Sequence, residues 1–186
     1  MSKLVDKAFA KLQKLNSNAT TLEKNTLSNV TEWIDTGCLV LNSILSGSLH
    51  GGVPKGRITI FAGESQCGKT FILNKILAKA QKQGMIPIIF DTEVAIEKEG
   101  AENVGLDVSN VKYVPIDTVE NCRNQIMAFL DEVENEPELH GKFIISIDSL
   151  GNLASSKEIL DAESNKGAMD MGLRAKQLKS MMRIIT

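Results

Sequence analysis

Cysteines are few in this sequence, and they form no pattern typical of disulfides or metal sites. Among 186 residues there are three cysteines, at positions 38, 67 and 122, and no two of them have the CxxC spacing. An odd, widely spaced set argues against a disulfide framework and against a zinc site. We therefore expect a reducing, cytoplasmic compartment.

The sequence also lacks a strong net charge and long apolar runs. With 21 basic and 23 acidic residues, the net charge is −2. No global positive field would hold a polyanion against the whole surface, so any contact with nucleic acid must be local. The N-terminal segment MSKLVDKAFAKLQKL has a lysine every three or four residues, which is untypical of a signal peptide or a membrane span. We expect no membrane partner.

The first 31 residues differ in pattern from the rest of the chain. Apolar residues recur at helical spacing between Leu4 and Leu12, with lysines on another face, which predicts an amphipathic helix. Residues 16–31 are rich in Asn, Ser and Thr and read as a linker. With 42% hydrophobic residues in the chain, residues 32–186 are long enough to form one domain with its own core.

From residue 57 onward, short apolar runs alternate with helical patterns, which predicts an α/β fold with a mainly parallel sheet. Helical spacing begins at Thr70 and ends near Gly84, recurs from Cys122 to Val133, and recurs again from Met171 to Ile185. The expected strands are RITIFA at 57–62, IPIIF at 86–90, VKYVPI at 111–116 and FIISI at 143–147.

One motif points directly to a ligand, because it matches G-x-x-x-x-G-K-[ST] at every fixed position. An apolar run precedes it and a helix follows, as a phosphate-binding loop requires. Glycines allow backbone N–H groups to converge on phosphate oxygens beside a helix N-terminus, the lysine adds a positive charge, and the final hydroxyl can bind Mg²⁺. We expect ATP with Mg²⁺ to bind at Gly63, Glu64, Ser65, Gln66, Cys67, Gly68, Lys69 and Thr70.

Acidic residues follow two of the expected strands, at the edge where ligands of open α/β sheets gather. Asp148 comes directly after the strand at 143–147 and is the candidate for a second Mg²⁺ contact, through water. Asp91 and Glu93 follow the strand at 86–90. Either carboxylate could orient or deprotonate the water that attacks the γ-phosphate, and position alone does not choose between them.

Cys67 lies inside the phosphate loop, next to a helix N-terminus, where a lowered thiol pKa is expected. Thiol-reactive reagents should therefore block nucleotide binding.

Beyond this loop, the chain from about Ile34 to its end resembles the RecA/Rad51-type recombinases, most closely the UvsX-type recombinases of T-even-like bacteriophages. The segment IDTGCLVLNSILSGSLHGGVPKGRITIFAGE is similar to the family's approach to the phosphate loop, in which an aliphatic helix precedes a Gly-rich turn. The segment SIDSLGNLASSKEILDA, which begins at Ser146, is very similar to the phage proteins and is far more specific than the phosphate loop alone.

The resemblance implies roles for particular residues. The family's catalytic glutamate stands in a D-x-E setting, which makes Glu93 the general base, with Lys69 as the second catalytic residue. A mobile first DNA-binding loop would correspond to Ala154–Ala168. The helix that follows it begins M-G-L in the family, as Met171 and Gly172 do here, and is expected to bind DNA, with Arg174 and Lys176 at the basic positions that contact the phosphate backbone.

The resemblance also implies partners. Family members bind single-stranded DNA and homologous duplex DNA, assemble into helical filaments through an N-terminal helix, and exchange strands in recombination, repair and replication. ATP lies between subunits of the filament. The alternative is an ATP-binding filament cap or regulator without turnover, and a hexameric helicase domain is a more distant one.

Two departures from the family pattern stand out. Gly100 occupies the position where family members commonly place an aromatic residue near the adenine. The family core also continues through further strands, a second DNA-binding loop and a residue that senses the γ-phosphate. The expected fold is therefore a RecA-like core truncated after the strand at 143–147 and the following helix, and a complementary C-terminal chain is a possible partner.

Overall fold

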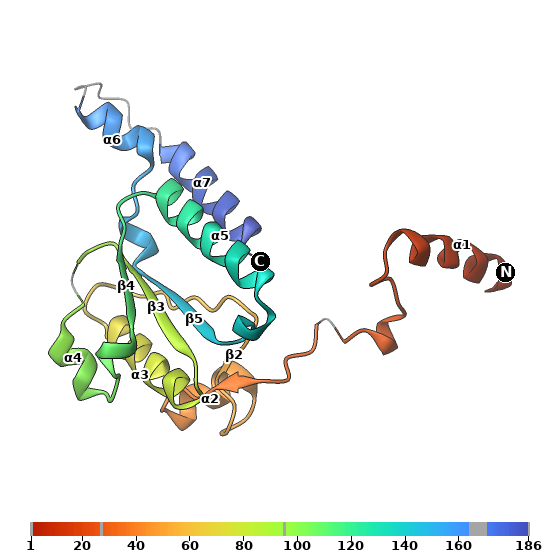
Figure 1. Ribbon diagram of the computed structural model, residues 1–186, viewed down its shortest axis with the longest axis horizontal. Coiled ribbons are helices and arrows are strands. Elements are labelled where there is room, and N and C mark those ends of the chain that lie inside the picture. Colours follow the sequence, from red (N-terminus) through yellow and green to blue (C-terminus); the bar gives the residue numbers. More distant parts are fainter. Residues whose placement is uncertain (1, 27, 95, 164–170, 186) are drawn as a thin grey trace. The chain divides into compact units, whose positions relative to one another are not determined.

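The structure of the chain is a computed structural model that describes residues 2–26, 28–94, 96–163 and 171–185 (Figure 1). It divides into two compact units, Met1–Thr31 and Glu32–Thr186. In the first unit, α1 spans Ser2–Leu15 and is followed by a single 3-10 turn, η1, at Leu22–Lys24. The predicted N-terminal helix is therefore present, and its apolar side chains are exposed, with Leu4 at 75% and Leu12 at 56% exposure.

The second unit is built on a parallel sheet, in agreement with the predicted α/β class. Its strands are β3 (Ile86–Asp91), β4 (Lys112–Pro115) and β5 (Phe143–Asp148), in the order β4-β3-β5. Asp91 is in register with both Pro115 and Asp148. The ends of β3 and β5 therefore bring their acidic residues to the same edge of the sheet.

Helices cover both faces of this sheet (Figure 1). Ile88 and Phe90 of β3 belong to one apolar cluster with residues of α5 and α7, whereas Ile89 belongs to a cluster on the other face with residues of α3 and α4. This alternation follows from the two-residue period of a strand. The helices in this part of the chain are α2 (Leu39–Ser46), α3 (Lys69–Lys82), α4 (Lys98–Asn103), α5 (Val119–Asn135), α6 (Ser156–Glu163) and α7 (Met171–Ile184).

Local sequence signals mark the start of α5 and the end of α3. The Thr118 side chain accepts a hydrogen bond from the Asn121 N–H and caps the start of α5. Gly84 has φ 81°, the left-handed conformation expected just after α3. On the inner face of α5, Cys122 and Ile126 are fully buried. Burial of an Ile side chain contributes about 1.5–3 kcal/mol.

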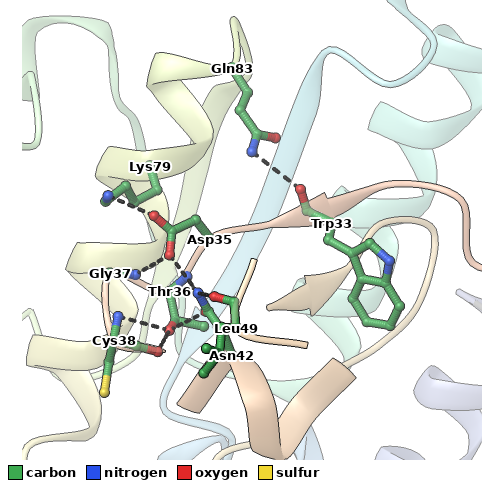
Figure 2. Close-up of polar contacts among 9 residues, drawn as sticks. All are labelled: Trp33, Asp35, Thr36, Gly37, Cys38, Asn42, Leu49, Lys79 and Gln83. Carbon is green, nitrogen blue, oxygen red and sulfur yellow. Dashed lines mark hydrogen bonds and ion pairs between the residues drawn. The ribbon is translucent and has the colours of Figure 1, made fainter. Parts of the chain in front are cut away.

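A small antiparallel pair, β1 (Trp33–Ile34) and β2 (Val53–Pro54), flanks α2. The carboxamide of Gln83, directly after α3, donates to the carbonyl of Trp33 at 3.2 Å (Figure 2). Ile34 and Ile76 of α3 share a buried apolar cluster. The segment before the phosphate loop is therefore attached to the helix that follows the loop.

The strand predicted at 57–62 is wrong, because residues 57–62 form no strand. Ile58 and Ile60 are 43% and 64% exposed. A strand requires a hydrogen-bonded neighbour, and within the described ranges β5 pairs only with β3. The apolar run alone could not show that this neighbour would be missing.

The prediction of a loop at Ala154–Ala168 is also wrong in its first half, because α6 spans Ser156–Glu163. Positions 164–168 lie outside the described residues. A capping box explains the helix: the Ser155 N–H donates to the Glu158 carboxylate at 2.6 Å, and the Glu158 N–H donates to the Ser155 hydroxyl at 3.2 Å. The S-x-x-E spacing was visible in the sequence and would have predicted this helix start.

Candidate nucleotide-binding site

The phosphate loop lies directly before α3, as its motif requires. Gln66 and Gly68 have positive φ values of 64° and 89°, and Gly68 is the residue that precedes the first turn of α3. Left-handed residues in such a loop turn successive N–H groups toward one concave side, which favours an anion there. A side chain at Gly63 would displace Cys67, because a Cβ atom at this position would lie 2.8 Å from the Cys67 sulfur.

The Lys69 side chain folds back across the same loop. Its ammonium group donates to the carbonyls of Gly63 at 3.0 Å and Glu64 at 2.6 Å, and it lies 4.0 Å from the Cys67 sulfur. Cys67 itself is exposed. The loop therefore combines a helix N-terminus, a left-handed turn and a cation, and this donor set fits a polyphosphate.

A short hydrogen bond joins the phosphate loop to the sheet. The Thr70 hydroxyl donates to the Asp148 carboxylate at 2.6 Å, across 78 residues of sequence. Thr70 stands in the first turn of α3 and Asp148 ends β5. A hydroxyl and a carboxylate beside a phosphate site are the hard oxygen ligands that Mg²⁺ prefers, so the residues present fit a Mg²⁺ ion.

The two acids after β3 have different surroundings. Asp91 is 1% exposed, and its carboxylate accepts the N–H groups of Glu93, Val94 and Ile96 at 2.9, 2.9 and 3.2 Å and the Tyr113 hydroxyl at 2.9 Å. Burial, and then this hydrogen bond to Asp91, raise the pKa of Tyr113. Asp91 therefore holds the turn after β3 in place.

Glu93, by contrast, is exposed on that turn. One of its carboxylate oxygens, Oε1, accepts the Asn152 amide at 2.6 Å and the Ser149 hydroxyl at 3.2 Å. No motif in the sequence pointed to Asn152. It was missed because this contact spans 59 residues and depends on how β3 and β5 end beside each other.

The residues expected to contact DNA are spread over the start of α7. The Arg174 guanidinium donates to the Leu153 carbonyl at 2.7 Å, and also to the carbonyls of Gly151 and Leu150. Gly172 and Lys176 are exposed, and the side chain of Met171 lies outside the described part of the chain. Of the four residues expected to contact DNA, Arg174 is thus the one whose hydrogen bonds to the loop after β5 are seen in the described part of the chain.

A buried polar network holds the segment before the loop to α3 (Figure 2). Asn42 is 1% exposed; its carbonyl oxygen accepts the Thr36 N–H at 2.9 Å and the Thr36 hydroxyl at 2.7 Å. Its amide donates to Asp35 at 2.8 Å and to the Leu49 carbonyl at 3.1 Å. Hydrogen bonds from Asn42 and then Lys79 lower the pKa of Asp35 to about 2.

None of the helices in the described ranges is both long and apolar enough to cross a membrane.

Comparison with known proteins places these features in a family. The family model of the RecA N-terminal domain matches residues 3–186. The chain is 32% identical over 160 residues to the "Recombination and repair protein" of Enterobacteria phage T4, covering 85% of this chain and 39% of that protein. It is 33% identical to "Protein RecA" of Nitratiruptor sp., covering 99% of this chain and 48% of the relative. For "Protein RecA" of Synechococcus elongatus, the identity is 34%, over 83% of this chain and 40% of the relative. The chain thus spans less than half the length of these relatives.

Proposed function

The chain belongs to the RecA family, and from this premise we propose that it is the ATP-binding part of a DNA strand-exchange recombinase. The observation that carries the proposal is the 2.6 Å hydrogen bond between Thr70 and Asp148. It joins the two elements that a nucleotide with its metal ion would have to contact together. The names of the relatives, which refer to RecA and to recombination and repair, support the same function.

In this proposal the loop from Gly63 to Thr70 binds the phosphates of ATP. Its N–H groups surround the phosphate oxygens, and Lys69 leaves its present carbonyl partners to neutralise charge on the β- and γ-phosphates. A guanidinium or ammonium bond to phosphate is stronger than a bond to a neutral carbonyl, so this exchange is favourable. The Thr70 hydroxyl and the Asp148 carboxylate would hold Mg²⁺, which would add positive charge beside the phosphates.

Glu93 is the proposed general base for hydrolysis. Its carboxylate is exposed and keeps one oxygen outside the contacts with Ser149 and Asn152. Asp91 is unsuited to the role, because its carboxylate is buried and already accepts three backbone N–H groups. The residues alone left these two acids undecided, whereas their surroundings favour Glu93.

The proposed partners are single-stranded DNA, homologous duplex DNA and further copies of the chain in a filament. At the start of α7, Arg174 and Lys176 would contact DNA phosphates, and Met171 and Gly172 would belong to the same DNA-binding stretch. The exposed apolar side of α1 would dock on the next subunit, because exposed leucines such as Leu4 and Leu12 gain by burial.

The test is binding and turnover of ATP by the wild-type chain and by Lys69→Ala, with Lys82→Ala as the matched control at the exposed end of α3. A hydrogen bond to a charged group contributes about 1.5–3 kcal/mol. We therefore expect Lys69→Ala to weaken the binding of a fluorescent ATP analogue by about 10–100-fold. Lys82→Ala should bind as the wild type does, and equal affinity of all three proteins would refute the site.

Single-stranded DNA should raise the rate of ATP hydrolysis. ATP binding without any DNA stimulation would instead support a filament cap or regulator.

A further inference from the structure

Among the described residues, Asn152 makes the shortest hydrogen bond to the Glu93 carboxylate. Its amide donates to Oε1 at 2.6 Å, and the Ser149 hydroxyl donates to the same oxygen at 3.2 Å. Among the described residues, no group donates to the other oxygen, Oε2. In the described part of the chain, the carboxylate is therefore held through Oε1, and Oε2 accepts no hydrogen bond.

The backbone that carries Asn152 is fixed on both sides. Arg174 donates to the carbonyl of Gly151, just before it, and to that of Leu153, just after it. The Leu153 side chain is fully buried in the apolar cluster under α5 and α7. Asn152 thus stands on a segment that α7 and the core hold still, which a positioning side chain requires.

The backbone around Ser149 and the backbone around Glu93 are also joined, through Thr92. The Thr92 hydroxyl accepts the Ser149 N–H at 2.9 Å and donates to the Ser149 carbonyl at 3.0 Å. On the other side of Thr92, the Asp91 carboxylate accepts the Glu93 N–H at 2.9 Å. The turn after β3 and the loop after β5 therefore form one hydrogen-bonded unit around the carboxylate.

We propose that Asn152 is a positioning residue for ATP hydrolysis: its amide fixes Glu93 through Oε1, so that Oε2 serves the attacking water. Arg174 acts one step further away, by fixing the backbone on either side of Asn152. The inference rests on the proposed function, in which Glu93 is the general base. It predicts that loss of the amide lowers the rate of hydrolysis without weakening the binding of ATP.

The first test is Asn152→Asp, which keeps the size of the side chain, removes its ability to donate and places a second negative charge beside the Glu93 carboxylate. We expect single-turnover hydrolysis at saturating MgATP, with single-stranded DNA present, to fall at least tenfold, while the Kd for ATP changes less than twofold. Asn152→Gln, which retains an amide on a longer stem, should recover part of the rate. Asn135→Asp at the exposed end of α5 is the matched control and should hydrolyse ATP as the wild type does.

A purely structural role for Asn152 would lower the unfolding midpoint and leave the rate per folded molecule unchanged. If the wild-type chain hydrolyses ATP and Asn152→Asp does so at the same rate, this inference alone is overturned. A wild-type chain that binds ATP and never hydrolyses it overturns the proposed base and this inference together.

The contact itself has an independent readout in the side-chain amide signals of a ¹⁵N-labelled chain. The Asn152 amide, assigned by its loss in Asn152→Asp, should be shifted downfield and slow to exchange with water. Glu93→Ala should abolish both features, and Asn135→Asp should leave them unaltered. If the Asn152 signal is unchanged in Glu93→Ala, the contact does not form, and the inference then fails.

Discussion

Asn42→Asp should destabilise the second unit strongly, although it changes only one atom of the side chain. Asn42 is 1% exposed and uses both ends of its carboxamide. The substitution keeps the acceptor for Thr36, but it replaces the amide donor by an oxygen that faces the Asp35 carboxylate and the Leu49 carbonyl. A favourable contact to each becomes a repulsion between acceptors.

The magnitude follows from the two hydrogen bonds that are lost. The bond to the charged Asp35 contributes about 1.5–3 kcal/mol and the bond to the Leu49 carbonyl about 0.5–1.5 kcal/mol, so the free energy of unfolding should fall by about 2–4 kcal/mol. Domains of this size are stable by about 5–15 kcal/mol. With an m-value of about 2 kcal/mol/M, the midpoint of urea unfolding should fall by about 1–2 M.

The stability of the wild type and of Asn42→Asp should depend on pH in different ways. In the wild type, the pKa of Asp35 is lowered to about 2, first by Asn42 and then by Lys79. The stabilisation that the ionised Asp35 carboxylate gives the wild type is therefore present above the unfolded pKa of about 3.9. It is lost as pH falls through the folded-state pKa of about 2. Because the Asp35 side chain is 39% exposed, we assign it no more than about 1 kcal/mol.

In Asn42→Asp, the introduced carboxyl faces Asp35, so its folded-state pKa lies above the unfolded value. Its destabilisation is complete above that pKa and is relieved as pH falls through it. The stability difference from the wild type should therefore narrow between pH 7 and pH 4. Asn135→Asp, exposed at the end of α5, should shift the midpoint by less than about 0.3 M. A similarly small shift in Asn42→Asp would refute the buried network.

Two further predictions concern the nucleotide site itself. Because Cys67 is exposed within the phosphate loop, modification by a thiol reagent should abolish ATP binding, and saturating MgATP should slow the modification; unchanged ATP affinity after modification of Cys67, confirmed by mass spectrometry, would contradict this. Asp148→Asn keeps an acceptor for the Thr70 hydroxyl, 2.6 Å away in the wild type, but it loses the charge that attracts a cation, so the gain in ATP affinity from added Mg²⁺ should shrink by about tenfold. Titrations in Mg²⁺ and in EDTA measure this gain, and one as large as in the wild type would exclude Asp148 from the metal site.

The elements with a strong periodic pattern were predictable from the sequence. The runs at 86–90 and 143–147 become the largely buried strand β3 and the half-buried strand β5, and the spacing from Cys122 to Val133 lies within α5. In these segments the local pattern and the tertiary environment agree, because each strand is covered by helices and α5 has one apolar face against the sheet.

The failures have the opposite cause. Residues 57–62 have the composition of a strand, yet a strand exists only where another backbone pairs with it, and no local pattern contains that partner. Asn152 gave no signal for the same reason: its contact with Glu93 depends on the register that sets the end of β3 beside the end of β5. The left-handed turn before α3 was predictable, since the eight residues from Gly63 to Thr70 are consecutive and the geometry of the turn is local.

The two acids of the D-x-E turn show how neighbours in sequence acquire separate roles. Asp91 ends β3 and is buried. Its carboxylate has lost its contacts with water there, and the backbone N–H groups that donate to it take the place of those contacts. Glu93, two residues on, has left the strand and is exposed, so its carboxylate is available to a ligand. The buried acid fixes the turn, and the turn fixes the exposed one. Substitutions at Asp91 should therefore act on folding and, through the turn, on turnover, whereas substitutions at Glu93 should act on turnover alone.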